Sequence, residues 1–404
     1  MVKGGYYTIA YGGTDLRSIS IAAKMIGSGR MAYFYRWSPG QPEKYIDPNV
    51  PMNTASNAVT VAPGCLYIVS LFNTLSYLKL RILWTCLLYV LAFYILFSFI
   101  VQRDNSPDRR VLLFVVGVVL FLSSPVWFLN IERGQVYIIF AFLFTLTYHL
   151  YRSPIGWKNF LAGVTIALAC YCRPNFFFVM IPIVVARNWK VLAGWGAAVF
   201  LLMIHAFLHE GLWEGYSAVV REFSSTIHEA TAVGHIHYQY PEVIEGLRNL
   251  TKYKNDFVCG GIQPLCEFIT PMIGLQSIYF YLGLYLAIVM TLLLIYRKKL
   301  VAGEAGTILL FGFLLYVIAE YIMPASRSAY NMILWMFPVL LFIRQPHLSP
   351  AYLVILFAGL CFINAIPFYF PFLHFTGEAL LIVFLLRYLS GDKKKRLQHF
   401  VIIA

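Results

Sequence analysis

Charged residues are scarce in this chain of 404 residues, where Asp, Glu, Lys and Arg together make up only 12%. A soluble domain carries about 25%, and here 60% of the residues are hydrophobic. From Leu78 onward, apolar runs recur that can cross a hydrocarbon core, which takes about 20 helical residues. Ten-residue segments of alternating polarity, which would indicate a membrane β-barrel, are absent. The sequence therefore predicts an all-α polytopic membrane protein.

Cysteine and metal-ligand patterns are also sparse. The seven cysteines form neither a disulfide framework nor a zinc-binding spacing. Most lie in or beside predicted spans, where a free cysteine packs as a small apolar residue. Cys259 and Cys266 share one long loop, and either pair in an oxidising compartment or stay free. The histidines of residues 228–237 lack a recognised spacing, so we expect no metal and no other cofactor.

The net charge of +13 raises the possibility of a nucleic-acid partner, but the positions of the charges argue against one. Lys and Arg gather in alternate loops, which is the pattern of cytoplasmic loops in membrane proteins. The segment 209–275 instead holds four Lys or Arg against eight Asp or Glu. We expect a multi-pass protein of the cell (inner) membrane with a cytoplasmic C-terminus. The basic clusters are Arg103, Arg109 and Arg110; Arg152 and Lys158; Arg187 and Lys190; residues 297–299; and Arg387 with residues 393–396.

About eleven transmembrane helices follow from the apolar runs and this topology. The predicted spans are 79–101, 111–129, 135–151, 157–172, 175–187, 190–208, 276–296, 304–323, 329–343, 350–365 and 370–388. The chain then divides into an outer-face loop, two blocks of spans separated by a second outer-face loop, and a basic cytoplasmic tail. Their bounds are 1–78, 79–208, 209–275, 276–388 and 389–404.

The N-terminal segment 1–78 does not fit this topology unaided. It holds six Lys or Arg and no apolar core of signal-peptide length. We therefore expect a twelfth helix upstream, missing from this chain. Within the segment, apolar residues recur at helical spacing over 15–28, which predicts an amphipathic helix on the outer leaflet. Thr14 or Asp15 would cap its N-terminus.

A polar gap separates two apolar helices in SSPVWFLNIERGQVYIIFAF, residues 123–142. The gap holds Asn130, Glu132, Arg133 and Gln135. The simplest interpretation is structural: Asn130 caps the helix that begins near Gln135, while Glu132 and Arg133 face water. The alternative is that the gap helps to form a site at the outer face.

Two further outer junctions each carry an arginine beside or behind a proline. Arg173 lies in YCRPNFF, and Arg327 lies in PASRSAYNMILW with Tyr330 and Asn331 just after it. An isolated arginine in such a place either extends to the lipid headgroups or pairs with an anion. Two of them beside the polar gap favour a site for an anionic group, because the guanidinium fork matches phosphate.

Asp15 is the candidate proton acceptor. At the start of a helix its carboxylate lies at the positive end of the helix dipole, which keeps it ionised. An ionised carboxylate at the membrane surface can take a proton from a hydroxyl. The alternative is a helix cap with no chemical role.

Four motifs, in order, resemble glycosyltransferase family 87. They are the Asp15-Leu-Arg17 opening with YIDP at 45–48, NIERGQV at 130–136, the segment 161–190 that contains Arg173-Pro174, and PASRSAYNMILWMFP at 324–338. The resemblance implies a GT-C fold of about twelve spans. It also implies transfer of a hexose, mannose in the known cases, from a polyprenyl phosphate to a lipid or glycan acceptor outside the cytoplasm. The transfer inverts the anomeric centre and uses no nucleotide.

The resemblance also implies roles for particular residues. Asp15 matches the general base, while Arg173 and Arg327 match basic positions near the donor phosphate. The sequence departs from the family at Asn331, where Asp is frequent, and the actinobacterial mannosyltransferases carry a His-His pair in this motif. Membrane lipids would surround the donor. The remaining residues expected to line the substrate cavity are Arg17, Asp47, Asn130, Glu132, Gln135, Tyr330 and Asn331.

Two other functions fit a polytopic protein with a polar cavity. A transporter or lipid flippase would place polar residues at mid-membrane depth and interrupt its helices there. The polar residues of this chain gather at the outer ends of the predicted spans instead, and Glu320 lies close to such an end as well. A membrane assembly factor without catalytic activity is the other alternative.

Overall fold

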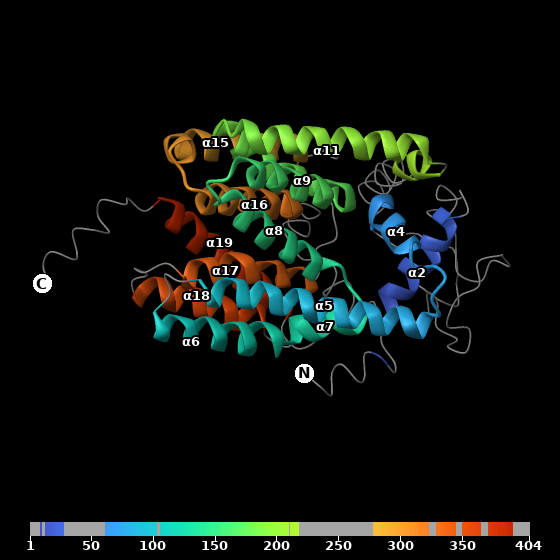
Figure 1. The fold of residues 1–404 in the computed structure, drawn as a ribbon. Helices are drawn as coiled ribbons and strands as arrows, with labels where there is room; N and C mark the ends of the chain where they lie inside the picture. Colours follow the sequence, from blue (N-terminus) through green and yellow to red (C-terminus); the bar gives the residue numbers. More distant parts are fainter. Residues whose placement is uncertain are drawn as a thin grey trace, which may run out of the picture.

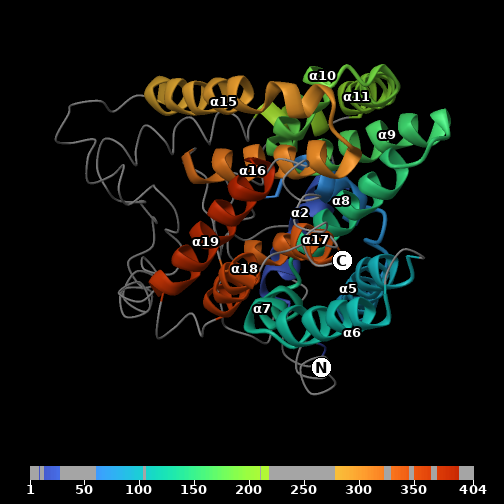
Figure 2. The ribbon, with the colours of Figure 1, turned by 90° about the vertical axis from the view of Figure 1, so that its left-hand side faces the viewer.

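The computed structural model describes the chain in stretches, and every regular element within them is helical. Apolar helices run side by side through most of the molecule, as Figures 1 and 2 show. The predicted all-α fold is confirmed for these stretches. The described residues are 9, 13–27, 61–102, 106–209, 211–217, 278–322, 329–344, 350–364 and 371–390.

Each predicted span coincides with a helical segment, although the ends differ by several residues. By length and composition, two described helices can cross a membrane, Tyr77–Ile100 and Trp189–Leu208, and one bent pair would make a third. A count of eleven crossings stays a prediction. The helices are α2 (Thr14–Gly27), α4 (Pro63–Ser70), α5 (Tyr77–Ile100), α6 (Pro107–Val115), α7 (Pro125–Arg133), α8 (Tyr137–Tyr151), α9 (Gly156–Cys172), α10 (Met180–Val185), α11 (Trp189–Leu208), α15 (Ile278–Val301), α16 (Ala305–Ile322), α17 (Met336–Ile343), α18 (Pro350–Ile363) and α19 (Pro371–Ser390).

Three of the predicted spans are interrupted. The span predicted at 111–129 comprises α6, a π-helix η1 (Val116–Leu122) and α7, and its two halves meet at 55°. Ser124 caps the new helix by accepting a hydrogen bond from the Trp127 amide at 3.1 Å, and Pro125 occupies its first turn. Two 3₁₀ segments, η2 (Pro174–Val179) and η3 (Ala329–Trp335), likewise precede α10 and α17.

The helices α9 and α11 pack backbone to backbone. A Cβ atom added to Gly163 would collide with the Val191 carbonyl oxygen, and one added to Gly194 would collide with that of Phe160. Small residues at facing positions allow this close approach between membrane helices. The contact fixes the direction of α9, whose end presents Arg173 to the rest of the protein.

The segment formed by η3 and α17 lies at the centre of the molecule. Every residue from 331 to 344 is buried. A helix that is apolar on all sides has to be covered on all sides, and here α5, α6 and α8 contact α17. The helices α7 and α8 contact η3, which has Tyr330 as its second residue.

That α2 lies on the membrane surface stays a prediction. Of the residues beside its apolar stripe, Arg17 is 7% exposed and Ser20 5%, whereas Lys24 is half-buried. The helices α4, α5 and α7 contact α2 and cover it. In Figure 1, α2 and α4 lie at one end of the bundle, where α5 begins and α11 ends.

Candidate functional site

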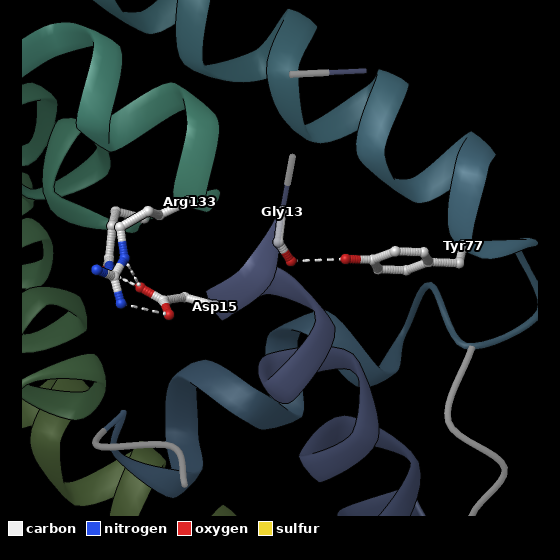
Figure 3. Close-up of polar contacts among 5 residues, drawn as sticks. Gly13, Asp15, Tyr77 and Arg133 are labelled. Carbon is white, nitrogen blue, oxygen red and sulfur yellow. Dashed lines mark hydrogen bonds and ion pairs between the residues drawn. The ribbon is translucent and has the colours of Figure 1, made fainter. Parts of the chain in front are cut away.

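The site begins where the start of α2 meets the end of α7. Gly13 precedes α2 with a φ of +89°, in the left-handed region that favours glycine. Its amide donates to the Glu132 carbonyl at 2.5 Å, and its own carbonyl accepts from the Tyr77 hydroxyl at 2.6 Å and the Arg17 amide at 2.7 Å. Figure 3 shows the contact with Tyr77. These bonds join α2 to α5 and α7 just before Asp15.

The Asp15 carboxylate does not cap the helix, because α2 begins at Thr14 and Asp15 lies within the first turn. Arg133 instead donates from Nε to Oδ2 at 2.7 Å and from a terminal nitrogen to Oδ1 at 3.0 Å, as Figure 3 shows. The Gln135 amide donates to Oδ2 as well. The Asp15 side chain is 17% exposed and that of Arg133 32% exposed. The interpretation that Arg133 simply faces water is therefore wrong.

Gly134 makes this approach possible. It ends α7 with a φ of +71°, and the turn returns the Gln135 amide to the Asn130 carbonyl at 2.9 Å. A Cβ atom at Gly134 would lie 2.6 Å from the Leu16 Cβ atom, next to Asp15. A glycine is required here by both the backbone conformation and the packing of α2.

Changing Gly134 to Ala is expected to destabilise the protein and to displace Asp15. The left-handed conformation costs about 1–2 kcal/mol for a residue with a Cβ atom, and the clash with Leu16 adds to this. A displacement of about 1 Å can reduce a reaction rate about 10²-fold. The measurements are thermal unfolding in detergent and sugar-transfer rate.

Gly196→Ala is the matched control for this substitution, since a Cβ atom at Gly196 meets nothing within 4 Å. It is expected to leave both the unfolding temperature and the transfer rate close to wild type. Equal behaviour of the two variants would contradict the role given to Gly134.

Asn130 joins α7 to η3 rather than capping α8, which begins only at Tyr137. Its side-chain amide nitrogen donates to the Val126 carbonyl at 2.9 Å and the Tyr330 carbonyl at 2.8 Å. The side chain is fully buried, and among the described residues its Oδ1 atom has no hydrogen-bond partner. The prediction that Asn130 is an N-cap is therefore wrong, because α7 continues to Arg133.

Tyr330 lies between two other side chains of the site. The Arg133 guanidinium lies 5.5 Å from the centre of its ring, and the Tyr137 ring centre is 5.2 Å away. A guanidinium over an aromatic face is an attractive contact. The next residue, Asn331, is fully buried, and neither of its side-chain amide atoms has a partner in the described part of the chain.

Arg173 continues this series of contacts. One terminal nitrogen donates to the Tyr137 hydroxyl at 2.6 Å, and the guanidinium lies 4.8 Å from the Tyr137 ring centre. Its other terminal nitrogen forms an ion pair with Glu320, whose Oε1 atom also accepts from the Tyr316 hydroxyl. The Glu320 side chain is 1% exposed and that of Arg173 20%. Arg173 therefore pairs with an anionic side chain, which is the second of the two interpretations offered for it.

The structure thus brings together most of the predicted site residues that it describes. Arg17 is buried beside Asp15 in α2, whereas the side chain of Glu132 is exposed and only its carbonyl takes part. The positions that lie outside the described residues are Asp47, Arg327, Cys259, Cys266 and residues 228–237.

Sequence reasoning missed three residues: Arg133 as the partner of Asp15, Tyr137 as the link between Tyr330 and Arg173, and Tyr316 as a donor to Glu320. Arg133 could have been identified from the sequence, since it lies in the polar gap directly before Gly134. The other two lie in apolar runs where a tyrosine carries no distinguishing signal.

Comparison with known families assigns the chain. A model of glycosyltransferase family 87 matches residues 62–256, slightly less than half of the chain, and this region includes Asn130, Gln135 and Arg173. Over this region the chain is similar to glycosyltransferase family 87, which supports the family-level assignment. That family implies a membrane glycosyltransferase. Neither the curated proteins nor the solved structures gave a match.

The region that matches the family model contains the end of α7 and the end of α9, but not α2 or η3. Contacts made in the folded chain connect the two outlying elements to it. Asp15 of α2 is bound by Arg133, and the carbonyl of Tyr330 in η3 is bound by Asn130.

Proposed function

We propose that this glycosyltransferase moves a hexose, with mannose as the first candidate, from a polyprenyl phosphate to a lipid or glycan acceptor. The reaction takes place at the extracytoplasmic face and inverts the anomeric centre. The observation that carries the proposal is one continuous series of contacts from an ionised carboxylate, Asp15, through Arg133, Tyr330 and Tyr137 to the Arg173 guanidinium. A proton acceptor and a phosphate-binding group then belong to one site.

The Asp15 carboxylate can still accept a hydrogen bond from the hydroxyl of the acceptor substrate. A carboxylate offers about four lone-pair positions, and Arg133 and Gln135 occupy three of them. The fourth is on Oδ1, which accepts only from Arg133 among these donors. Charged and amide donors hold the carboxylate in one orientation. Asp15 thereby accepts the proton as the acceptor oxygen attacks the sugar.

Arg173 and Arg327 bind the donor phosphate in this mechanism. Negative charge accumulates on that phosphate as its bond to the sugar breaks, and a guanidinium fixed in place stabilises the charge without reorganising. Arg173 is fixed by Tyr137 and Glu320, and its Nε atom has no partner among the described residues. A phosphate is a good leaving group, so the mechanism requires no general acid.

The sidedness of the site follows from the distribution of basic residues. In the topology predicted from the sequence, Asp15, the polar gap and Arg173 fall on the side opposite the Lys- and Arg-rich loops. Such loops face the cytoplasm, which supports an extracytoplasmic site in the cell membrane and a cytoplasmic C-terminus.

The donor class is tested with purified protein and a panel of radiolabelled donors. Polyprenyl-phosphate mannose, polyprenyl-phosphate glucose and GDP-mannose are each incubated with membrane lipids extracted from the host. Transfer from a polyprenyl phosphate, but not from the nucleotide sugar, is the expected result. Transfer from GDP-mannose alone would overturn the proposed donor.

A transporter or lipid flippase is the second candidate, and the interrupted helices favour it, because transporters bind their substrates where helices break. The break between η1 and α7 is the clearest case here. Reconstituted vesicles separate the two functions. A donor that crosses the bilayer with its sugar still attached, while no labelled product forms, would replace the transferase proposal.

A further inference from the structure

Glu320 is a buried carboxylate for which the mechanism above has no use. It lies one turn after Tyr316 on α16, is 1% exposed, and forms an ion pair with Arg173. A buried charge needs a partner, so the simplest account is that Glu320 neutralises Arg173. The same arginine is the proposed ligand of the donor phosphate, so Glu320 also affects how tightly Arg173 binds that phosphate.

The Arg173 guanidinium has donor capacity beyond its present partners. A guanidinium carries five N–H groups, and the contacts described here are those to Tyr137 and Glu320. The Nε atom is buried and has no partner in the described part of the chain. A phosphate can therefore bind Arg173 while Glu320 stays in place, which brings a second anion to this guanidinium.

The charge on the phosphate changes during the reaction. A bond forms between the acceptor oxygen and the anomeric carbon, the bond from that carbon to the phosphate oxygen breaks, and the acceptor proton moves to Asp15. The donor is a phosphodiester with one negative charge. The released polyprenyl phosphate is a monoester and carries between about −1.5 and −2 charges at neutral pH.

We propose that Glu320 is a positioning residue that acts through Arg173 to weaken the binding of the product phosphate more than that of the donor. This inference rests on the proposed function, because it assigns the phosphate to Arg173. Like charges repel in proportion to the product of their charges, so the fixed carboxylate opposes the monoester about twice as strongly as the diester. Glu320 thus favours release of the spent carrier.

The test is equilibrium binding of two probes, polyprenyl phosphate and polyprenyl-phosphate mannose, to wild type and Glu320→Gln in detergent. The variant is expected to bind polyprenyl phosphate about tenfold more tightly, which corresponds to about 1.4 kcal/mol. It is expected to bind the donor only about threefold more tightly. Turnover with saturating donor is expected to fall, because product release slows.

Two further variants separate charge from packing. Tyr316→Phe removes a hydrogen bond to the same Glu320 oxygen and leaves the charge, so the ratio of the two affinities should match wild type. Glu320→Asp keeps the charge and should keep the affinity ratio within about twofold of wild type. Thermal unfolding of each variant identifies any loss of the fold.

An unchanged affinity ratio in Glu320→Gln, or weaker binding of both probes, would overturn the inference and leave Glu320 a purely structural partner of Arg173. The binding measurement does not depend on turnover. If wild type transfers no sugar while Glu320→Gln still binds polyprenyl phosphate more tightly, the proposed function fails, and only the effect of Glu320 on phosphate binding stands.

Discussion

Replacing Asp15 with Asn is expected to slow sugar transfer by about 10²–10⁴-fold, the range over which general bases contribute to enzymatic rates. Asparagine has nearly the same shape, and its carbonyl oxygen can still accept a hydrogen bond from Arg133, but it cannot take up a proton at neutral pH. The measurement is the initial rate at saturating donor and acceptor. Donor binding should stay close to wild type, because Asp15 is assigned to the acceptor.

Two variants control for a purely structural role of Asp15, which also holds α2 against α7. Asp108→Asn removes an exposed carboxylate in the first turn of α6 and should leave the rate unchanged. Arg133→Met breaks the same ion pair but retains the carboxylate, so we expect about a tenfold loss of rate. If Arg133→Met and Asp15→Asn lose rate and thermal stability in parallel, Asp15 is a structural anchor and not the base.

Replacing Arg173 with Ala is expected to reduce kcat/KM for the donor by about 10²–10³-fold, as for other fixed donors that stabilise a developing negative charge. Lysine at this position keeps the charge but cannot reproduce the fork that contacts Tyr137 and Glu320 together. We therefore expect Arg173→Lys to recover only part of the loss. The measurement is donor-dependent initial rate at saturating acceptor.

Removing Arg173 alone leaves the buried Glu320 without its cation, which costs about 3–5 kcal/mol in comparable cases. Loss of activity in Arg173→Ala could then reflect unfolding. The double variant Arg173→Met, Glu320→Gln removes both charges together and is expected to unfold close to the wild-type temperature while remaining inactive. Recovery of transfer in this double variant would contradict a role for Arg173 in donor use.

The positions of the helices could be predicted from the sequence, because long apolar runs determine them directly. Their interruptions could not. Hydropathy stays high through residues 111–129, and only Ser124 and Pro125 mark the new helix start that produces the bend. The same local ambiguity placed the end of α7 too early and led to the wrong role for Asn130.

The burial of α2 shows a different limit. A stripe of apolar residues with Arg17, Ser20 and Lys24 beside it is typical of a helix at an interface. Whether polar residues face water depends on which other elements pack against them, and α4, α5 and α7 come from distant parts of the sequence.

Predictions for the site depended on whether the relevant contacts were local. The proximity of Gln135 to Asp15 followed only from a family resemblance, since 120 residues separate them. The pair of Arg173 and Glu320 is separated by 147 residues, and no pattern in either segment identifies the other. Arg327 and Asp47 stay predictions, because they lie outside the described residues.

Transfer of a sugar from a polyprenyl phosphate, with Asp15 as the proton acceptor, can be observed in a single turnover. Radiolabelled mannose is followed from polyprenyl-phosphate mannose to host membrane lipids, with wild type and Asp15→Asn at matched donor occupancy. We expect a new labelled lipid or glycan with wild type, and we expect it to form about 10²–10⁴-fold more slowly with the variant. Equal transfer by both proteins, or none by wild type despite bound donor, would contradict this mechanism.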